Sequence, residues 1–170
     1  LASASCMDKS HTHIVLDYCG IKTAKWQLVT QREINHLEKK CVEIAHALGF
    51  PLFVKPANAG SSIGINKAND LSELEVAVFG YDSPFASYAG EIEACNDFYD
   101  YNAKYDSPSK LYIPARIDDR KMAEIRETAI KAYKCLGCKG LSRVDFFLTD
   151  DGVLYLNEIN TLPGFTSISM

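Results

Sequence analysis

The sequence predicts an α+β fold in which antiparallel hairpins, rather than regular β-α-β units, build the sheet. Apolar residues recur at helical spacing over 31–48 and again over a stretch that ends at Leu136. Two apolar runs flank residues 149–152, and the Asp-Gly pair in that turn is a strong hairpin signal. Helices combined with hairpins in this way indicate the α+β class.

Three helices are expected in chain order. Residues 8–19 are predicted to form a short helix that ends at Gly20. The helix over 31–48 has five regularly spaced apolar side chains before Gly49: Ile34, Leu37, Cys41, Ile44 and Leu48. The third helix begins at Asp118 or Asp119, runs through Leu136 and buries one face: Met122, Ile125, Ala129 and Tyr133.

The remaining apolar runs are predicted to be strands. Strands are expected at five of them: 52–55, 63–65, 74–79, 141–148 and 153–157. The first two flank a loop of small residues and should form one hairpin, and the last two form the arms of the Asp-Gly hairpin. Residues 81–109 show no steady period, so we expect a long functional loop there.

Composition and charge exclude several classes of protein. The chain has 170 residues, a formal net charge of −4 and 47% hydrophobic residues, which is typical of a globular protein. Mild acidity gives no support to nucleic-acid binding, and no apolar run approaches the roughly 18 to 20 residues that span a bilayer. The start, LASASCMDKS, lacks the apolar core of a secretory signal. We therefore expect a cytoplasmic protein with neither a nucleic-acid nor a membrane partner.

Cysteines are expected to be reduced and structural. The chain has six cysteines, and Cys135 and Cys138 form a CxxC pair. A zinc or redox site would need a second ligand pair or a thioredoxin-like context, and the four histidines show no zinc-type spacing.

Polar residues near the end of the chain predict a metal site. Asp145 and Glu158 lie on the two arms of the predicted hairpin, and Asn160 shares a strand face with Glu158. Carboxylate and amide oxygens suit Mg²⁺ bound to nucleotide phosphates. Arg143 points to the same face as Asp145 and could stabilise a developing anion. The alternative, weighted equally on spacing alone, is an exposed polar face of an edge hairpin.

Two loops have features of phosphate-binding segments. Lys55 ends an apolar run and precedes the small-residue loop 56–62, which could present an ammonium group and backbone N–H groups to phosphate oxygens. Residues 98–105 interleave aromatic side chains with Lys104, as in a lid that excludes water. Gly164 would permit close approach of the backbone to a ligand. The alternatives are a polar hairpin turn, an ordinary surface loop and a simple turn.

Taken together, the motifs resemble those of the ATP-grasp enzymes, and in particular of the D-alanine–D-alanine ligase family. The matching segments occur in the family's order: MDK, VKPxxxGSSxG, FYDYxAKY, RVDFF and NEINTLPGFTS. The resemblance covers nearly the whole chain and implies an ATP-grasp fold, with antiparallel sheets and flanking helices in two lobes.

The resemblance implies a role for several residues at the nucleotide. Lys9 and Lys55 match lysines that contact the ATP phosphates, and Ser62 lies in the phosphate-covering loop. Ser61 matches a serine bonded to the lid tyrosine, Tyr105. Two further matches are Lys104, on the transferred phosphate, and Glu73, on the ATP ribose.

Further matches concern the metal and the acceptor. Asp145, Glu158 and Asn160 match the ligands of two Mg²⁺ ions, for which Mn²⁺ can substitute. Arg143 and the Gly164 backbone match groups that stabilise the tetrahedral intermediate. Ser169 and Met170 fall where the family binds the carboxylate of the second substrate.

The implied activity is the ATP-dependent joining of two D-alanines through an acyl phosphate, for peptidoglycan precursors, by a homodimer. Three alternatives remain: a D-alanine–D-serine ligase, another ATP-grasp carboxylate–amine ligase, and a nucleotide-binding fragment without catalysis. The lid sequence FYDYNAKY argues against the second of these.

The resemblance also implies a domain division and missing parts. Residues 1–72 should form the small lobe, with the phosphate-loop hairpin, and residues 73–170 the large lobe. The family's N-terminal substrate domain would precede Leu1, and its final helix would follow Met170. A helix and an adenine-contacting strand are also missing from inside the chain, with the junction near 71–74. A chain of only these 170 residues is expected to have no ligase activity.

Overall fold

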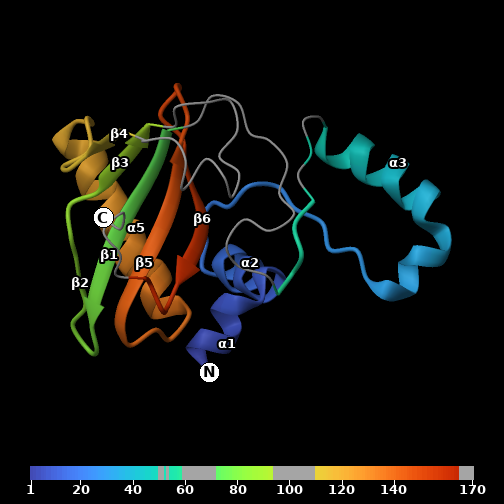
Figure 1. The fold of residues 1–170 in the computed structure, drawn as a ribbon, viewed down its shortest axis with the longest axis horizontal. Coiled ribbons are helices and arrows are strands. Elements are labelled where there is room, and N and C mark those ends of the chain that lie inside the picture. Colours follow the sequence, from blue (N-terminus) through green and yellow to red (C-terminus); the bar gives the residue numbers. More distant parts are fainter. Residues whose placement is uncertain (50–51, 53, 59–71, 94–109, 165–170) are drawn as a thin grey trace.

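An antiparallel sheet of six strands is the centre of the molecule (Figure 1). The computed structural model describes residues 1–49, 52, 54–58, 72–93 and 110–164. The strand order is β4-β3-β1-β5-β6, and β2 pairs with β1 outside this path. The strands are β1 (Ser72–Gly80), β2 (Phe85–Ala86), β3 (Gly90–Glu93), β4 (Lys110–Tyr112), β5 (Gly140–Leu148) and β6 (Leu154–Asn160). The predicted α+β class is therefore confirmed.

Helices cover one face and one edge of this sheet. The helical elements are α1 (Ala2–Met7), α2 (Lys9–Tyr18), the 3₁₀ helix η1 (Gln31–His36), α3 (Leu37–Leu48) and α5 (Asp119–Cys135). Figure 1 shows α5 along one face of the sheet, α1 and α2 near β6, and α3 away from the sheet. The segment after α2 meets the outer edge of β6, where the Leu156 N–H donates to the Lys22 carbonyl at 2.9 Å. Within the described part of the chain, no helix is long and apolar enough to cross a bilayer.

Local sequence signals account for the helix boundaries. Asp118 is the N-cap of α5, and its side chain accepts a hydrogen bond from the Lys121 N–H at 2.7 Å. Asp8 caps α2 in the same way, through the His11 N–H at 3.0 Å. The helix predicted over 31–48 is present, but its first six residues form the 3₁₀ helix η1. The short helix α1 was not predicted.

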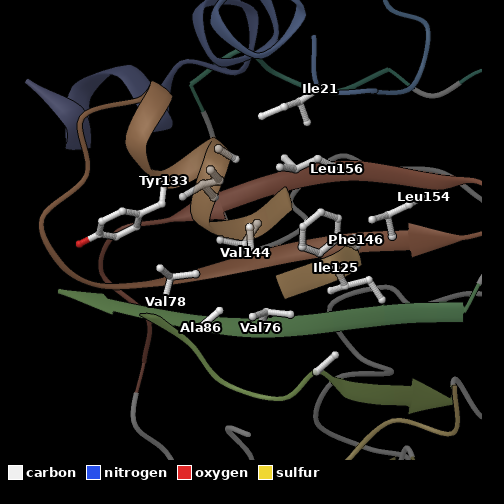
Figure 2. Packing of buried hydrophobic residues seen from close by; sticks show 14 of the residues in the cluster. Ile21, Val76, Val78, Ala86, Ile125, Tyr133, Val144, Phe146, Leu154 and Leu156 are labelled. Carbon is white, nitrogen blue, oxygen red and sulfur yellow. The ribbon is translucent and has the colours of Figure 1, made fainter. Parts of the chain in front are cut away.

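The core lies between α5 and the sheet (Figure 2). Val76 and Val78 of β1 alternate with outward-facing residues, and Val144 and Phe146 of β5 do the same. They pack against the apolar face of α5, in which Ile125, Ala129 and Tyr133 are fully buried. This is the helix face that the periodicity predicted.

Two predictions about local structure were wrong. Residues 52, 54 and 55 lie in no strand, and the side chain of Val54 is 81% exposed, so this apolar run is not packed as a strand requires. Its expected partner, 63–65, lies outside the described residues. The predicted loop over 81–109 contains β2 and β3, because the short runs 85–86 and 90–93 pair with β1. The rest of that loop, 94–109, also lies outside the described residues.

The cysteine prediction was wrong for one pair. Cys19, the C-cap of α2, forms a disulfide with Cys135, the last residue of α5. These residues are 116 positions apart, so only the packing of α2 beside α5 brings them together. Cys6 and Cys138 are free, and their sulfur atoms lie 3.9 Å apart.

A buried tyrosine links α5 to the end of the sheet. The Tyr133 hydroxyl lies 2.7 Å from the Gly80 carbonyl oxygen and 2.8 Å from that of Gly140, and it donates to them. Gly80 and Gly140 are paired at the end of the β1–β5 ladder. The hydroxyl therefore satisfies carbonyl groups at the point where this ladder ends.

Replacing Tyr133 with phenylalanine should destabilise the protein by about 1 to 3 kcal/mol, because two carbonyl acceptors lose their buried donor. Urea denaturation measures the change. Exposed Tyr81 provides the control, since Tyr81→Phe should change stability by less than about 0.5 kcal/mol. Equal effects of the two substitutions would contradict the role of the Tyr133 hydroxyl.

An ion-pair cluster joins β3, β4 and the segment that follows them. Arg116 donates to both oxygens of Glu91, at 2.6 and 3.1 Å, and its guanidinium lies 3.5 Å from the centre of the Tyr112 ring. The Tyr112 hydroxyl donates to Glu93 at 3.0 Å. The Glu91 side chain is only 10% exposed, and the Arg116 hydrogen bonds lower its pKa. The pair therefore stabilises the folded state when Glu91 is ionised.

Glu91→Gln should lower the urea midpoint at pH 7, because Arg116 loses its charged partner. Since the pKa of Glu91 is lowered on folding, this stabilisation is complete above the ordinary value of 4.5 and is lost as the pH falls through the folded value. The difference between wild type and variant should therefore shrink below pH 4.5. Exposed Glu127 on α5 is the control, because Glu127→Gln removes a charge outside this cluster. A difference independent of pH would contradict the ion-pair account.

Candidate functional site

Three carboxylates form a row across the centre of the sheet. Glu75 of β1 pairs with Asp145 of β5, which in turn pairs with Glu158 of β6. Because neighbouring residues of a strand point to opposite faces, this row lies on the face opposite Val144 and Phe146 and therefore opposite α5. The sequence predicted Asp145 and Glu158 as partners, and the structure pairs them.

A β-bulge at Asn157 puts Glu158 on this face. Phe146 pairs with Leu156 and Asp145 with Glu158, so Asn157 has no partner in β5. In a regular ladder Asn157 would lie opposite Asp145, and Glu158 would join Leu154 and Leu156 on the core face. With the bulge, Ile159 packs in the core, and Glu158 and Asn160 share the face of Asp145.

Arg143 lies among all three carboxylates. It donates to Asp145 through Nε at 2.8 Å and through Nη2 at 2.9 Å. Nε also lies 3.2 Å from Oε1 of Glu75, and Nη2 lies 3.9 Å from Oε1 of Glu158. One guanidinium therefore faces three carboxylates, and the face keeps an excess of negative charge.

Burial makes Asp145 the least solvated of these carboxylates. Asp145 is 2% exposed, and this desolvation raises its pKa to about 7, although the two hydrogen bonds from Arg143 act in the opposite direction. Glu75 and Glu158 raise the pKa further, because like charges lie nearby. A cation placed at this face would favour the ionised form.

Two lysines lie at the β6 edge of the same region. The Lys9 N–H donates to the Ala57 carbonyl at 3.0 Å, which joins the start of α2 to the segment that carries Lys55. The Lys55 ammonium donates to Oδ1 of Asn157 at 3.5 Å. Lys9 also borders a small pocket next to β6 whose other lining residues are Cys6, Thr12, His13, Asn157, Glu158 and Ile159. The predicted phosphate-contacting lysines therefore lie beside the predicted metal ligands.

The oxygen donors on this face suit Mg²⁺. Asp145, Glu158 and Asn160 supply two carboxylates and one amide, the hard ligands that Mg²⁺ prefers. Among the described residues, no three Asp, Glu, His or Cys side chains form a ready metal site. At Asp145, both carboxylate oxygens accept hydrogen bonds from Arg143. The donor chemistry thus fits the ion, and binding would require Arg143 to share or release Asp145.

Several predicted site residues are placed only in part or not at all. Glu73 lies in β1 and pairs with Phe147. Gly164 lies after β6, and among the described residues a Cβ there would meet no atom within 4 Å. The others lie outside the described residues: Ser61, Ser62, Lys104, Tyr105, Ser169 and Met170.

Sequence reasoning missed Glu75. Its contacts with Arg143 depend on the pairing of β1 with β5, which residue spacing does not reveal. A signal was present, because Glu75 lies in the predicted strand 74–79, Glu73 directly precedes that strand, and both alternate with apolar residues. Two glutamates on one face of an otherwise apolar strand point to a polar site on that face.

The antiparallel sheet, with a row of three carboxylates on one face and α5 on the other, has the ATP-grasp fold that the motifs predicted, and similar solved structures share it. The chain belongs to the D-alanine–D-alanine ligase family: the family model described as the D-ala D-ala ligase C-terminus matches residues 15–75 and 68–170.

Curated relatives and solved structures agree with this assignment. The D-alanine–D-alanine ligase of Thermoanaerobacter sp. strain X514 is 46% identical over 198 residues, covering 100% of this chain and 55% of the relative. The VanG D-Ala:D-Ser ligase from Enterococcus faecalis has a TM-score of 0.85 and 38% identity, covering 100% of this chain and 56% of that one. The D-alanyl-alanine synthetase A from Vibrio cholerae has a TM-score of 0.83 and 29% identity, with 99% and 59% covered.

The chain spans about half the length of the curated relatives that it matches. The Thermoanaerobacter alignment extends over 198 residues whereas this chain has 170, so the relative carries residues inside the aligned region that this chain lacks. The two family matches overlap at 68–75. This overlap supports the junction that the sequence predicted near 71–74.

Deleting Asn157 should lower the free energy of unfolding by less than about 2 kcal/mol. The deletion removes the bulge and leaves Glu158 opposite Asp145 and Ile159 in the core. Deleting Tyr155, two residues earlier, should instead lower the free energy of unfolding by more than about 4 kcal/mol or prevent folding. The reason is that Leu156 would move from the core face of the sheet to the opposite face. Urea denaturation compares the two deletions. Equal destabilisation would show that Asn157 is not the extra residue of the ladder.

Proposed function

We propose that this chain is the nucleotide- and metal-binding part of an ATP-dependent ligase that joins two D-alanines for peptidoglycan precursors. One observation carries the proposal: in a member of the D-alanine–D-alanine ligase family, the Asn157 bulge sets Glu158 and Asn160 beside Asp145 and Arg143. Lys9 and Lys55 at the neighbouring edge of β6 support the proposal, because cationic side chains offset the negative charge of nucleotide phosphates.

The residues on this face have separate roles in the formation of an acyl phosphate and in its reaction with the second substrate. Lys9 and Lys55 contact the ATP phosphates, Glu73 the ribose, and Asp145, Glu158 and Asn160 hold Mg²⁺ or Mn²⁺. The bound metal offsets phosphate charge during phosphoryl transfer. Arg143, together with the Gly164 backbone, stabilises the anion that develops when the second amine attacks the acyl phosphate.

Residues outside the described ranges complete the proposed site. Ser62 covers the phosphates, Ser61 and Tyr105 join the phosphate loop to the lid, and Lys104 contacts the transferred phosphate. A lid is needed because an acyl phosphate hydrolyses readily in water. Ser169 and Met170 bind the carboxylate of the second substrate.

We also propose that residues 1–72 and 73–170 form the two lobes. The protein is proposed to be cytoplasmic and to form a homodimer.

D-Serine is the second candidate for the acceptor substrate, because the solved structure with a TM-score of 0.85 is a D-Ala:D-Ser ligase.

The test uses a chimera in which this chain replaces the matching residues of the Thermoanaerobacter ligase, and the relative keeps every segment that this chain lacks, including the residues inside the aligned region. We expect phosphate release that requires ATP, Mg²⁺ and D-alanine. Glu158→Gln should lower the rate at least about 100-fold, because a metal ligand is lost. Glu127→Gln, on the far side of the sheet, should leave the rate unchanged. The 170-residue chain alone should release no phosphate in a D-alanine-dependent way.

The chimera also identifies the acceptor. With equal D-alanine and D-serine, the mass of the dipeptide product shows which amine attacks. Absence of D-alanine-dependent phosphate release from a folded chimera would reject the ligase assignment. A D-alanyl-D-serine product would establish the second candidate.

A further inference from the structure

We propose that Glu75 is a positioning residue that holds Arg143 in place when Asp145 binds the metal ion. This inference rests on the proposed metal site and concerns a residue outside the predicted ligand set. Glu75 lies on β1, so Asp145 separates it from Glu158 and Asn160 on β6. A metal held by β5 and β6 therefore leaves Glu75 on the opposite side of Asp145.

Arg143 needs such a partner because its present one is also a metal ligand. Both Asp145 oxygens accept hydrogen bonds from Arg143, at 2.8 and 2.9 Å. A divalent cation at Asp145 would draw on the same carboxylate charge and would repel the guanidinium. Metal binding therefore weakens the strongest contacts that hold Arg143.

Of the carboxylates placed within 4 Å of Arg143 in the described residues, Glu75 alone is not a predicted metal ligand. Its Oε1 lies 3.2 Å from Nε of Arg143, whereas Glu158 lies 3.9 Å from Nη2 and belongs to the ligand set. The Glu75 side chain is 14% exposed, so its contact with the guanidinium is shielded from water. Glu75 can thus keep Arg143 on the site face while Asp145 turns to the metal.

The test measures Mn²⁺ binding to the 170-residue chain by electron paramagnetic resonance, with no nucleotide and no turnover. Glu75→Gln should weaken Mn²⁺ binding about tenfold, as loss of a group that orients a metal site typically does. Glu75→Asp keeps the carboxylate and should restore most of the affinity. Glu127→Gln on α5 should leave the affinity unchanged.

A double-mutant cycle separates positioning from simple loss of negative charge. In an Arg143→Met background, Glu75→Gln should weaken Mn²⁺ binding by less than about threefold, because only the distant charge is lost. An equal loss in both backgrounds would overturn the inference, as would unchanged affinity in Glu75→Gln alone.

Nuclear magnetic resonance of the Arg143 Nε–H group provides a readout that needs no second substitution. With Mg²⁺ bound, this proton should exchange with solvent several-fold faster in Glu75→Gln than in the wild type, and equal exchange overturns the inference. Asp145→Asn tests the metal site itself. If wild type and Asp145→Asn bind Mn²⁺ equally, the proposed site fails together with Glu75, whereas failure of Glu75→Gln alone leaves the site standing.

Discussion

The geometry of the candidate site depends on one extra residue in β6. Leu154 and Leu156 face the core, and continued alternation would turn Glu158 to that side as well. The bulge at Asn157 reverses the alternation once, so Ile159 joins the core and Glu158 and Asn160 join Asp145. The same bulged residue accepts a hydrogen bond from Lys55. The core position of Ile159, the position of Glu158 beside Asp145 and the contact with Lys55 therefore all depend on this bulge.

Electrostatics explains how the buried Asp145 carboxylate is accommodated in the sheet. A buried carboxylate is costly unless it is paired, and Asp145 is almost fully buried. Arg143 supplies the compensation, with two hydrogen bonds to Asp145 and a further contact to Glu75. The guanidinium therefore binds the same carboxylate that we propose as a ligand of the divalent cation. Arg143 thus offsets part of the negative charge on this face of the sheet.

Features encoded by neighbouring residues could be predicted, and features that depend on distant pairing could not. The Asp118 cap, the apolar face of α5 and the Asp-Gly hairpin were each correct. The shared face of Glu158 and Asn160 was also correct, because a two-residue spacing fixes it in a strand. The bulge, the Glu75 contact and the Cys19–Cys135 disulfide depend on which segments lie side by side. The short strands β2 and β3 owe their structure to pairing with β1 and carry little signal of their own.

The position of the internal junction allows the proposed metal site to be tested separately from the proposed ligation. The overlap of the two family matches ends at residue 75, inside the first half of β1. Every residue of β1 from Ser72 to Gly80 nevertheless has a partner in β5, and β5 pairs in turn with β6. Glu75, Arg143, Asp145 and Glu158 are therefore assembled by pairing within this chain alone. The proposed metal binding can consequently be measured on the 170-residue chain, and the proposed ligation is tested separately on the chimera.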